Sequence, residues 1–192
     1  MNKISTEKLF KIAYSYLQNK NYIKSIELFK KIQVNYPNNL SVLRNLSHAY
    51  AFSGDFINAE NTIKNIIKLN ENEPYIFQFL ASILRNQDKI EEMISLIDKG
   101  LKKNLMNPKW KYQKDLLFPI IVKDNKEIDK YREKVSNCYD KILKKNEELN
   151  YDNDQIIQTP HYEMSYNQYD NLELNTKSVK ALRKIYKELN ET

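Results

Sequence analysis

Two histidines and one cysteine are the most reactive side chains of this sequence, and each of them is isolated. His48 lies in the first half of the chain and His161 follows a proline in the second half, and neither is accompanied by a nucleophile motif. A metal site would lack cysteine and histidine partners at the usual spacing. Cys138 falls on an apolar stripe, which favours a buried small residue over a nucleophile. The sequence therefore predicts no catalytic residue, no metal site and no cofactor.

A second kind of chemistry, the binding of a peptide, is open to a set of polar and aromatic residues. Their amide, guanidinium and imidazole groups can hydrogen-bond an extended backbone, and their rings can hold apolar side chains. The predicted binding residues are Tyr14, Arg44, Asn45, His48, Phe52, Gln78, Arg85 and Asn86. For each of them, a solvated surface role stays an open alternative.

The elements that must position these residues follow from a period of about 34 residues. The period starts at Thr6, Leu40 and Pro74, and the same residue types recur at equal offsets from each start. The recurring sets are Leu9/Leu43/Phe77, Ile12/Leu46/Leu80, Ala13/Ser47/Ala81, Tyr16/Tyr50/Leu84, Tyr22/Phe56/Ile90, Ser25/Ala59/Met93 and Phe29/Ile63/Ile97.

Each recurring position has a steric reason. Offsets of three and four place the large residues on one face of a first helix. The small residues let a second helix approach closely, and a polar turn such as Ser53-Gly54-Asp55 joins the two helices. The pattern predicts helix pairs over 6–37, 40–71 and 74–105. The binding residues fall on the first helices, away from the seam, so they are expected to line one concave groove.

This pattern resembles the tetratricopeptide repeat. The resemblance implies an all-α fold, a helical solenoid of about three helix pairs followed by capping and C-terminal helices. We expect residues 1–107 to hold three repeats, 108–149 a capping helix and a long connector helix, and 150–192 an irregular Tyr/Asn/Asp-rich segment and a C-terminal helix. The residues expected in the capping helix are Trp110, Tyr112, Leu116 and Leu117.

The second half has weaker helical patterns. Asp124 is a predicted helix cap, with Glu127 at the spacing of a capping box. The apolar stripe that follows is Ile128, Tyr131, Val135, Cys138, Ile142 and Leu149. The segment around 151–169 is expected to be the most mobile part of the chain. The stripe of the last helix is Leu172, Val179, Leu182, Tyr186 and Leu189. That helix is expected either to fold back on the helix with Ile128 or to stay loosely attached.

Residues 116–189 are also similar to the connector of SPINDLY-like protein O-linked N-acetylglucosamine transferases. The similarity is carried by Phe118-Pro119-Ile120-Ile121, Glu127, Ile128, Arg132, Ile142, Leu143, Pro160, His161, Tyr162, Tyr166, Asp170, Asn171, Leu174, Leu182, Ile185 and Tyr186. In that family two nucleotide-sugar-handling lobes follow the connector, and no segment here corresponds to them. The chain is therefore expected to be an expressed fragment, a truncated product or one piece of a split gene, and to bind no uridine-diphosphate sugar by itself.

Charge and composition narrow the function classes. The 192 residues carry a net charge of +6, but only four of the 31 basic residues are arginines, which argues against specific nucleic-acid recognition. No apolar run is long enough to cross a membrane, and the start lacks the apolar stretch of a signal peptide. A single cysteine fits a reducing compartment. We therefore expect a cytoplasmic protein.

Two functions stay open from the sequence. The first is a non-catalytic, protein-binding repeat arm related to protein glycosyltransferases, with possible association with a glycosyltransferase catalytic domain. The second is an independent tetratricopeptide adaptor or scaffold that is unrelated to glycosylation. Both hold a protein or an extended peptide segment in the concave groove.

Overall fold

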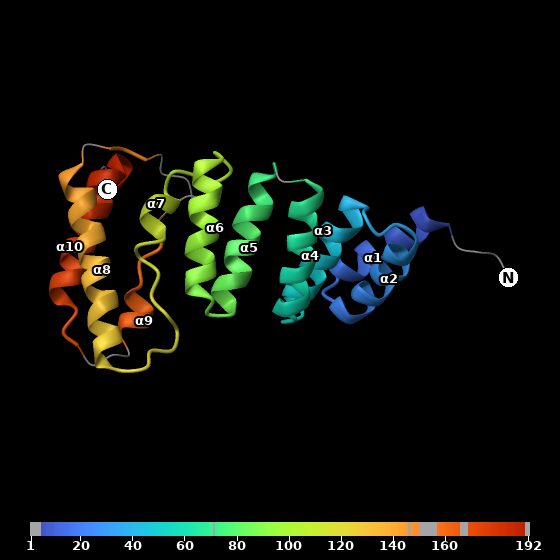
Figure 1. Cartoon of the computed structure of the whole chain (residues 1–192), viewed down its shortest axis with the longest axis horizontal. Coiled ribbons are helices and arrows are strands. Elements are labelled where there is room, and N and C mark those ends of the chain that lie inside the picture. The colour runs from blue at the N-terminus through green and yellow to red at the C-terminus, as the bar shows by residue number, and fades with distance from the viewer. Residues whose placement is uncertain (1–4, 71, 146, 150–156, 166–168, 191–192) are drawn as a thin grey trace. The chain divides into compact units, whose positions relative to one another are not determined.

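The computed structural model describes residues 5–70, 72–145, 147–149, 157–165 and 169–190 (Figure 1). The helices run in the order α1 (Thr6–Gln18), α2 (Tyr22–Asn35), α3 (Leu40–Phe52), α4 (Phe56–Leu69), α5 (Pro74–Asn86), α6 (Ile90–Lys102), α7 (Trp110–Gln113), α8 (Asn125–Lys144), α9 (His161–Ser165), α10 (Leu172–Ile185) and the 3₁₀ helix η1 (Lys187–Asn190). No strand occurs in the described ranges, so the all-α fold class is confirmed. The first six helices fall inside the three predicted pairs.

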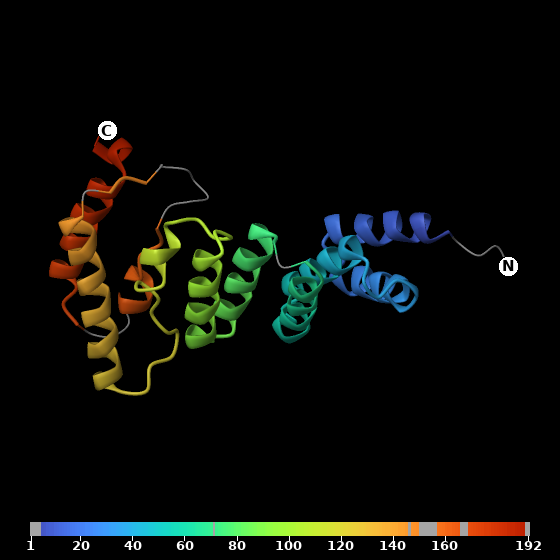
Figure 2. The same ribbon diagram turned by 45° about the horizontal axis from the view of Figure 1, so that its top comes forward.

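The chain divides into two compact units, Met1–Gln87 (unit 1) and Asp88–Thr192 (unit 2). The predicted division at 1–107, 108–149 and 150–192 stays a prediction about its domains. In unit 1, α1 packs on α2, α3 packs on α2 and α4, and α4 packs on α5 (Figures 1 and 2). This order of contacts is that of stacked helix pairs.

The periodic residues build the core of unit 1, as the period predicts. The small positions Ala13, Ser25 and Ala59 are each 0% exposed. The Ser25 hydroxyl donates a hydrogen bond to the Ala13 carbonyl at 3.0 Å, so α1 and α2 approach to side chain–backbone contact there. Large residues at the periodic positions of α3 to α5 are buried around these crossings. A larger side chain at a small position would overlap the neighbouring backbone.

The turns between paired helices also repeat. Lys20 and Gly54 occupy the same place in successive turns, and both have positive φ angles, 59° and 85°. Glycine adopts this conformation without strain, whereas lysine does so at a cost. The next residues, Asn21 and Asp55, cap α2 and α4 by accepting hydrogen bonds from backbone N–H groups of the first turn. The turn chemistry thus ends one helix and starts the next.

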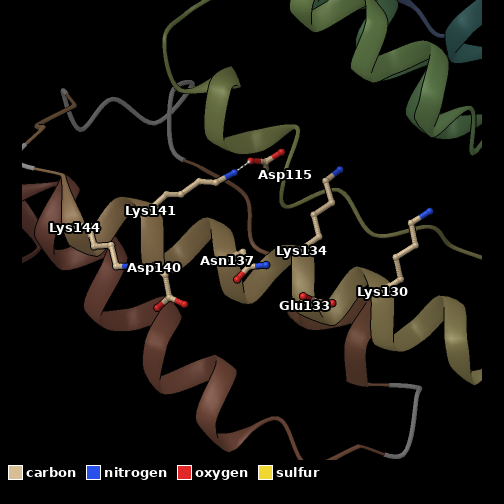
Figure 3. A pocket seen from close by; sticks show the side chains of 8 residues that line it. All are labelled: Asp115, Lys130, Glu133, Lys134, Asn137, Asp140, Lys141 and Lys144. Atoms are coloured by element: carbon tan, nitrogen blue, oxygen red, sulfur yellow. Dashed lines mark hydrogen bonds and ion pairs between the residues drawn. The ribbon is translucent and has the colours of Figure 1, made fainter.

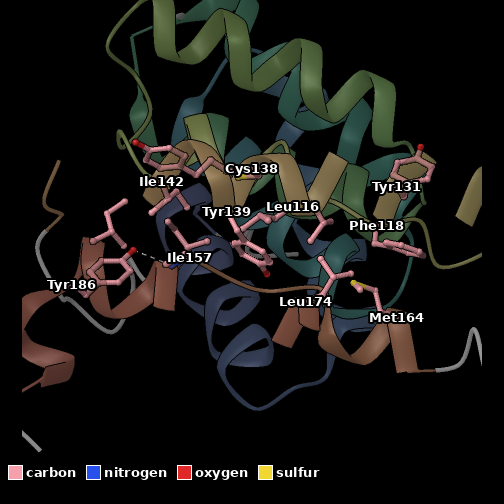
Figure 4. Close-up of a cluster of buried hydrophobic side chains, with 14 of the residues drawn as sticks. Leu116, Phe118, Tyr131, Cys138, Tyr139, Ile142, Ile157, Met164, Leu174 and Tyr186 are labelled. Atoms are coloured by element: carbon pink, nitrogen blue, oxygen red, sulfur yellow. Dashed lines mark hydrogen bonds between the residues drawn. The ribbon is translucent and has the colours of Figure 1, made fainter. Parts of the chain in front are cut away.

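Unit 2 is organised around α8 (Figure 4). Asp124 caps this helix by accepting a hydrogen bond from the Glu127 N–H, as predicted. The Glu127 carboxylate instead accepts from the Lys123 N–H, one residue before the cap. The buried residues of this unit's core are Tyr112, Leu116, Phe118, Ile128, Tyr131, Val135, Cys138, Tyr139, Ile142, Ile157, Met164, Leu174, Ala181, Ile185 and Tyr186. Of the predicted α8 stripe, Leu149 lies outside the helix, because the helix ends at Lys144.

The predicted capping helix is much shorter than expected. Only Trp110 and Tyr112 of its four expected apolar residues lie in α7, which is one turn long. Leu116 and Leu117 follow the helix, in a bend and the irregular segment after it, and both are buried. Both leucines are therefore buried without belonging to a helical face, because the helix ends at Gln113.

The last helix folds back on α8, which was one of the two predicted outcomes, and its predicted stripe is right in part. Tyr186 is fully buried, and Leu182 and Leu189 pack against the core of unit 2. Leu172 and Val179, predicted in the stripe, are exposed. The buried face is Leu174, Ser178, Ala181 and Ile185. Two small residues on this face let α10 lie close against α8, and this proximity outweighs the burial of larger side chains elsewhere on the helix.

Polar contacts hold the segments after α8 in place. The Gln113 side chain exchanges two hydrogen bonds with the Gln158 backbone, at 3.0 and 2.7 Å. Arg132 on α8 donates to the Asp170 carbonyl at 2.8 Å, and Lys177 on α10 donates to Asp140 at 3.1 Å. A short helix, α9, occupies part of the segment predicted to be irregular. The greatest mobility was predicted around 151–169, and of these residues 151–156 and 166–168 lie outside the described residues.

Candidate functional site

Five aromatic side chains form a cluster on unit 1, which we call the aromatic cluster: Tyr22, His48, Phe52, Tyr75 and Phe79. The His48 ring stacks on the Phe79 ring with a centroid distance of 4.4 Å and lies 5.9 Å from the Tyr75 ring. Phe52 lies 5.8 Å from His48 and 5.7 Å from Tyr22. The cluster therefore links the start of α2, the C-terminal half of α3 and the first half of α5.

The cluster reaches the surface. Phe52 is 59% exposed and Tyr75 is 54% exposed, although both are large and mostly apolar. Contiguous exposed apolar surface commonly marks a binding site in a folded protein. Because the rings are held against one another, they present this surface without a large loss of side-chain freedom on binding.

His48 is a structural centre of the cluster. Its Nε2 atom lies 3.0 Å from the Tyr75 hydroxyl, within hydrogen-bond distance. Burial among the rings lowers the pKa of His48 and raises the pKa of Tyr75. Both groups are therefore neutral near pH 7, and the cluster carries no charge of its own.

Arg44, a predicted binding residue, forms an ion pair with another residue of unit 1. Its guanidinium forms a two-pronged ion pair with the Glu73 carboxylate, with one contact at 3.1 Å. Glu73 is the N-cap residue of α5, but its side chain makes no capping hydrogen bond. It also accepts a hydrogen bond from Asn70 at 2.8 Å. The pair links α3 to the start of α5 and neutralises the arginine.

The predicted amides are also bonded within their own helices. The Asn45 side chain donates to the Ser41 carbonyl and the Asn86 side chain to the Ser82 carbonyl, each at 2.8 Å. Gln78 is exposed on α5, and Arg85 is half-buried on the same helix. Tyr14 is exposed on α1. The structure thus joins two predicted residues, His48 and Phe52, in one cluster, while the binding role of all eight stays a prediction.

Sequence reasoning missed three members of the cluster, Tyr22, Tyr75 and Phe79. Tyr75 and Phe79 are four residues apart in the third repeat, so they share one face of a helix that is not the seam with Phe77 and Leu80. That spacing was a usable signal. Tyr22 gave no such signal. It stands at a position of the 34-residue period, and packing between helices already explains an aromatic residue there.

A hollow of about 540 Å³ adjoins the aromatic cluster. Its walls include two members of the cluster, Tyr22 and Phe52. The remaining lining residues are Asn19, Lys20, Asn21, Ile23 and Ser53. It therefore lies where the α1–α2 turn meets the end of α3, and its lining mixes apolar and polar residues.

Unit 2 has a second hollow along α8, and its lining is charged (Figure 3). The lining residues are Asp115, Lys130, Glu133, Lys134, Asn137, Asp140, Lys141 and Lys144. Lys141 forms an ion pair with Asp115 at 2.9 Å, and Lys134 donates to the Lys114 carbonyl at 3.0 Å. Within the protein, these bonds engage two of the four lysines that line the hollow, so we regard this hollow as a weaker candidate than the aromatic cluster.

The remaining reactive residues, Cys138 and His161, belong to unit 2. Cys138 is fully buried in unit 2, and burial together with Asp115 raises its pKa to about 12, which keeps the thiol protonated. His161 is exposed at the start of α9. Within the part of the chain that the structure describes, no three histidine, cysteine or acidic side chains group as metal ligands do. Among these same residues, no helix combines the length and apolar character needed to cross a membrane.

We expect acid to weaken unit 1 through His48. Burial holds the pKa of His48 below its ordinary value of 6.5, so the unfolded chain takes up the proton first as the pH falls. The free energy of unfolding should therefore fall as the pH drops below about 6.5, the ordinary pKa of histidine. The fall should end once the pH passes below the pKa of His48 in the folded protein. Urea unfolding of the parent and of His48→Gln at several pH values checks this, with His161 kept in both. An equally steep loss of stability in the variant would contradict the prediction.

No family model matches this chain, and a search of curated proteins also gave no match. Among solved structures, the chain is similar to the Sgt2 TPR domain from Aspergillus fumigatus, with a TM-score of 0.48 and 16% sequence identity. The similarity covers 69% of this chain and 80% of that domain.

Proposed function

We propose that this chain is a protein–protein interaction module that binds an extended segment of a partner along α1, α3 and α5 of unit 1. The observation that carries the proposal is the aromatic cluster, whose rings are packed together and still expose Phe52 and Tyr75. Stacked helix pairs present the first helices as one continuous surface, which suits an extended ligand.

The aromatic cluster is suited to binding a ligand, and its described residues do not form a catalytic arrangement. A preorganised group of rings buries apolar side chains of a ligand at low entropic cost. His48 is the ionisable group of the cluster with the best catalytic potential, and its ring contacts Tyr75, Phe79 and Phe52, none of which is a serine, threonine or cysteine nucleophile. Binding without chemistry is therefore the function that this arrangement supports best.

Selection from a random peptide library displayed on phage tests the proposal. Peptides selected on the parent protein should bind a Phe52→Ser, Tyr75→Ser double variant at least about tenfold more weakly, because a central apolar contact is worth more than 1 kcal/mol. Val34→Ser is the matched control, since Val34 is 82% exposed on the second helix α2 and outside the surface. Equal binding to all three proteins, with unchanged circular dichroism, would contradict the proposal.

A narrower version of this proposal is a non-catalytic arm of a protein O-GlcNAc transferase. It rests on the resemblance of residues 116–189 alone, and an adaptor unrelated to glycosylation fits the helical repeats equally well. Several residues that carry the resemblance, such as Phe118, Leu174 and Ile185, are buried in the core of unit 2. Packing accounts for these residues without any link to a glycosyltransferase.

A further inference from the structure

We infer that the aromatic cluster and its adjoining hollow form an anchor site for an uncharged, apolar side chain, aromatic or aliphatic, of the bound protein segment, and that the site disfavours acidic segments. This inference rests on the proposed function and adds the chemistry of the partner to it.

The first step is the neutralisation of Arg44. Its guanidinium engages both oxygens of the Glu73 carboxylate, and Asn70 donates a further hydrogen bond to the same carboxylate at 2.8 Å. A carboxylate from a ligand would have to displace Glu73 from an intramolecular pair that is already formed. Displacement leaves Glu73 without its cation beside a second negative charge, and both effects oppose the binding of acidic side chains.

The second step is the neutrality of the surrounding groups. Burial disfavours the charged form of His48, and its ring is held by Phe79 and Tyr75. The cation among the residues that line the hollow, Lys20, is exposed in the α1–α2 turn, where water and salt screen its charge. The site therefore lacks a buried positive charge that could hold an acidic ligand.

The third step is the apolar surface that remains. Ile23 and Phe52 both line the hollow and are exposed, and Tyr22 packs against Phe52 between α2 and α3. The hollow, at about 540 Å³, has room for a large side chain of the partner together with part of its backbone. Asn19, Asn21 and Ser53 add polar groups to its lining, with which a peptide backbone can hydrogen-bond.

Three matched peptide libraries in one Gly/Ser host test the inference by fluorescence anisotropy with the full chain. Their central positions carry Phe, Trp and Leu, or Asp and Glu, or Lys and Arg. We expect the apolar library to bind at least about tenfold more tightly than the charged ones, and its affinity to change by less than about twofold between 0.05 and 0.5 M NaCl. The Phe52→Ser, Tyr75→Ser double variant should lose this binding, and Val34→Ser should keep it.

Glu73→Gln provides a second, independent readout. This change removes the anion that neutralises Arg44, so the variant should gain salt-sensitive binding of the acidic library and keep its binding of the apolar library. No gain of acidic binding in a folded Glu73→Gln variant would contradict the neutralisation step.

The outcomes separate the inference from the proposed function. If the parent prefers the acidic or the basic library, and the double variant loses that binding, the surface is a peptide site and only the inference fails. Dimerisation that the double variant abolishes would show that a second copy covers the cluster, which also overturns the inference. If the double variant binds every library and every selected peptide as the parent does, both the inference and the proposed function fail.

Discussion

Replacing Ala59 by leucine is expected to lower the free energy of unfolding of unit 1 by about 1 to 3 kcal/mol. Ala59 is 0% exposed on α4, which packs on both α3 and α5. The equivalent position of the preceding pair is Ser25, whose hydroxyl touches the Ala13 carbonyl at 3.0 Å. A leucine side chain has no space at such a crossing, so the helices must move apart and lose their contacts.

Far-UV circular dichroism during urea unfolding measures this effect, because the described part of the fold is helical. Asn61→Leu is the matched control, since Asn61 lies two residues further along α4 and is exposed. The control should change stability by no more than about 0.5 kcal/mol. Equal stability of Ala59→Leu and the parent would show that the assigned repeat register is wrong.

Replacing Tyr186 by phenylalanine is expected to destabilise unit 2 by about 1 to 3 kcal/mol. The Tyr186 hydroxyl accepts a hydrogen bond from the Ile157 backbone N–H at 3.0 Å. Tyr186 is 0% exposed and Ile157 is 2% exposed, so water cannot readily replace the lost partner. A buried N–H group without an acceptor costs more than the net value of the bond that it made.

The fluorescence of Trp110 reports on unit 2, because the chain has one tryptophan and it lies there, and far-UV circular dichroism follows the helices of both units, including the one that bears the control. Tyr36→Phe removes the hydroxyl of an exposed tyrosine at the end of α2, where water can take over its bonding. That control should be nearly neutral. A loss of stability as small in Tyr186→Phe as in Tyr36→Phe would indicate that the Ile157 N–H finds another acceptor.

Much of unit 1 was predictable because its determinants are local and repeated. Helix length, the capping residues Asn21 and Asp55, and the turn with Gly54 depend on neighbouring residues, so the sequence defines them without knowledge of the whole fold. The periodic placement of Ala13, Ser25 and Ala59 then predicts which helix faces meet.

The errors arose where burial depends on a partner that comes from elsewhere in the chain. On α10, the large residues Leu172 and Val179 predicted one face, but α8 packs against the face with Ser178 and Ala181. Close approach of two backbones, and not the size of the side chains, decided which face is buried. The pattern of residues in one helix does not show which of its faces another helix will approach most closely.

The sequence by itself determined that paired helices form, which residues join them, and that polar and aromatic side chains gather on the first helices. The tertiary structure decided which of these side chains are available for binding. It paired Arg44 with Glu73, bonded Asn45 within its own helix, and joined His48 to Phe79 and Tyr75. The physical reason is that helix periodicity acts over a few residues, whereas ion pairs and ring stacking require atoms from different helices to come within a few ångströms.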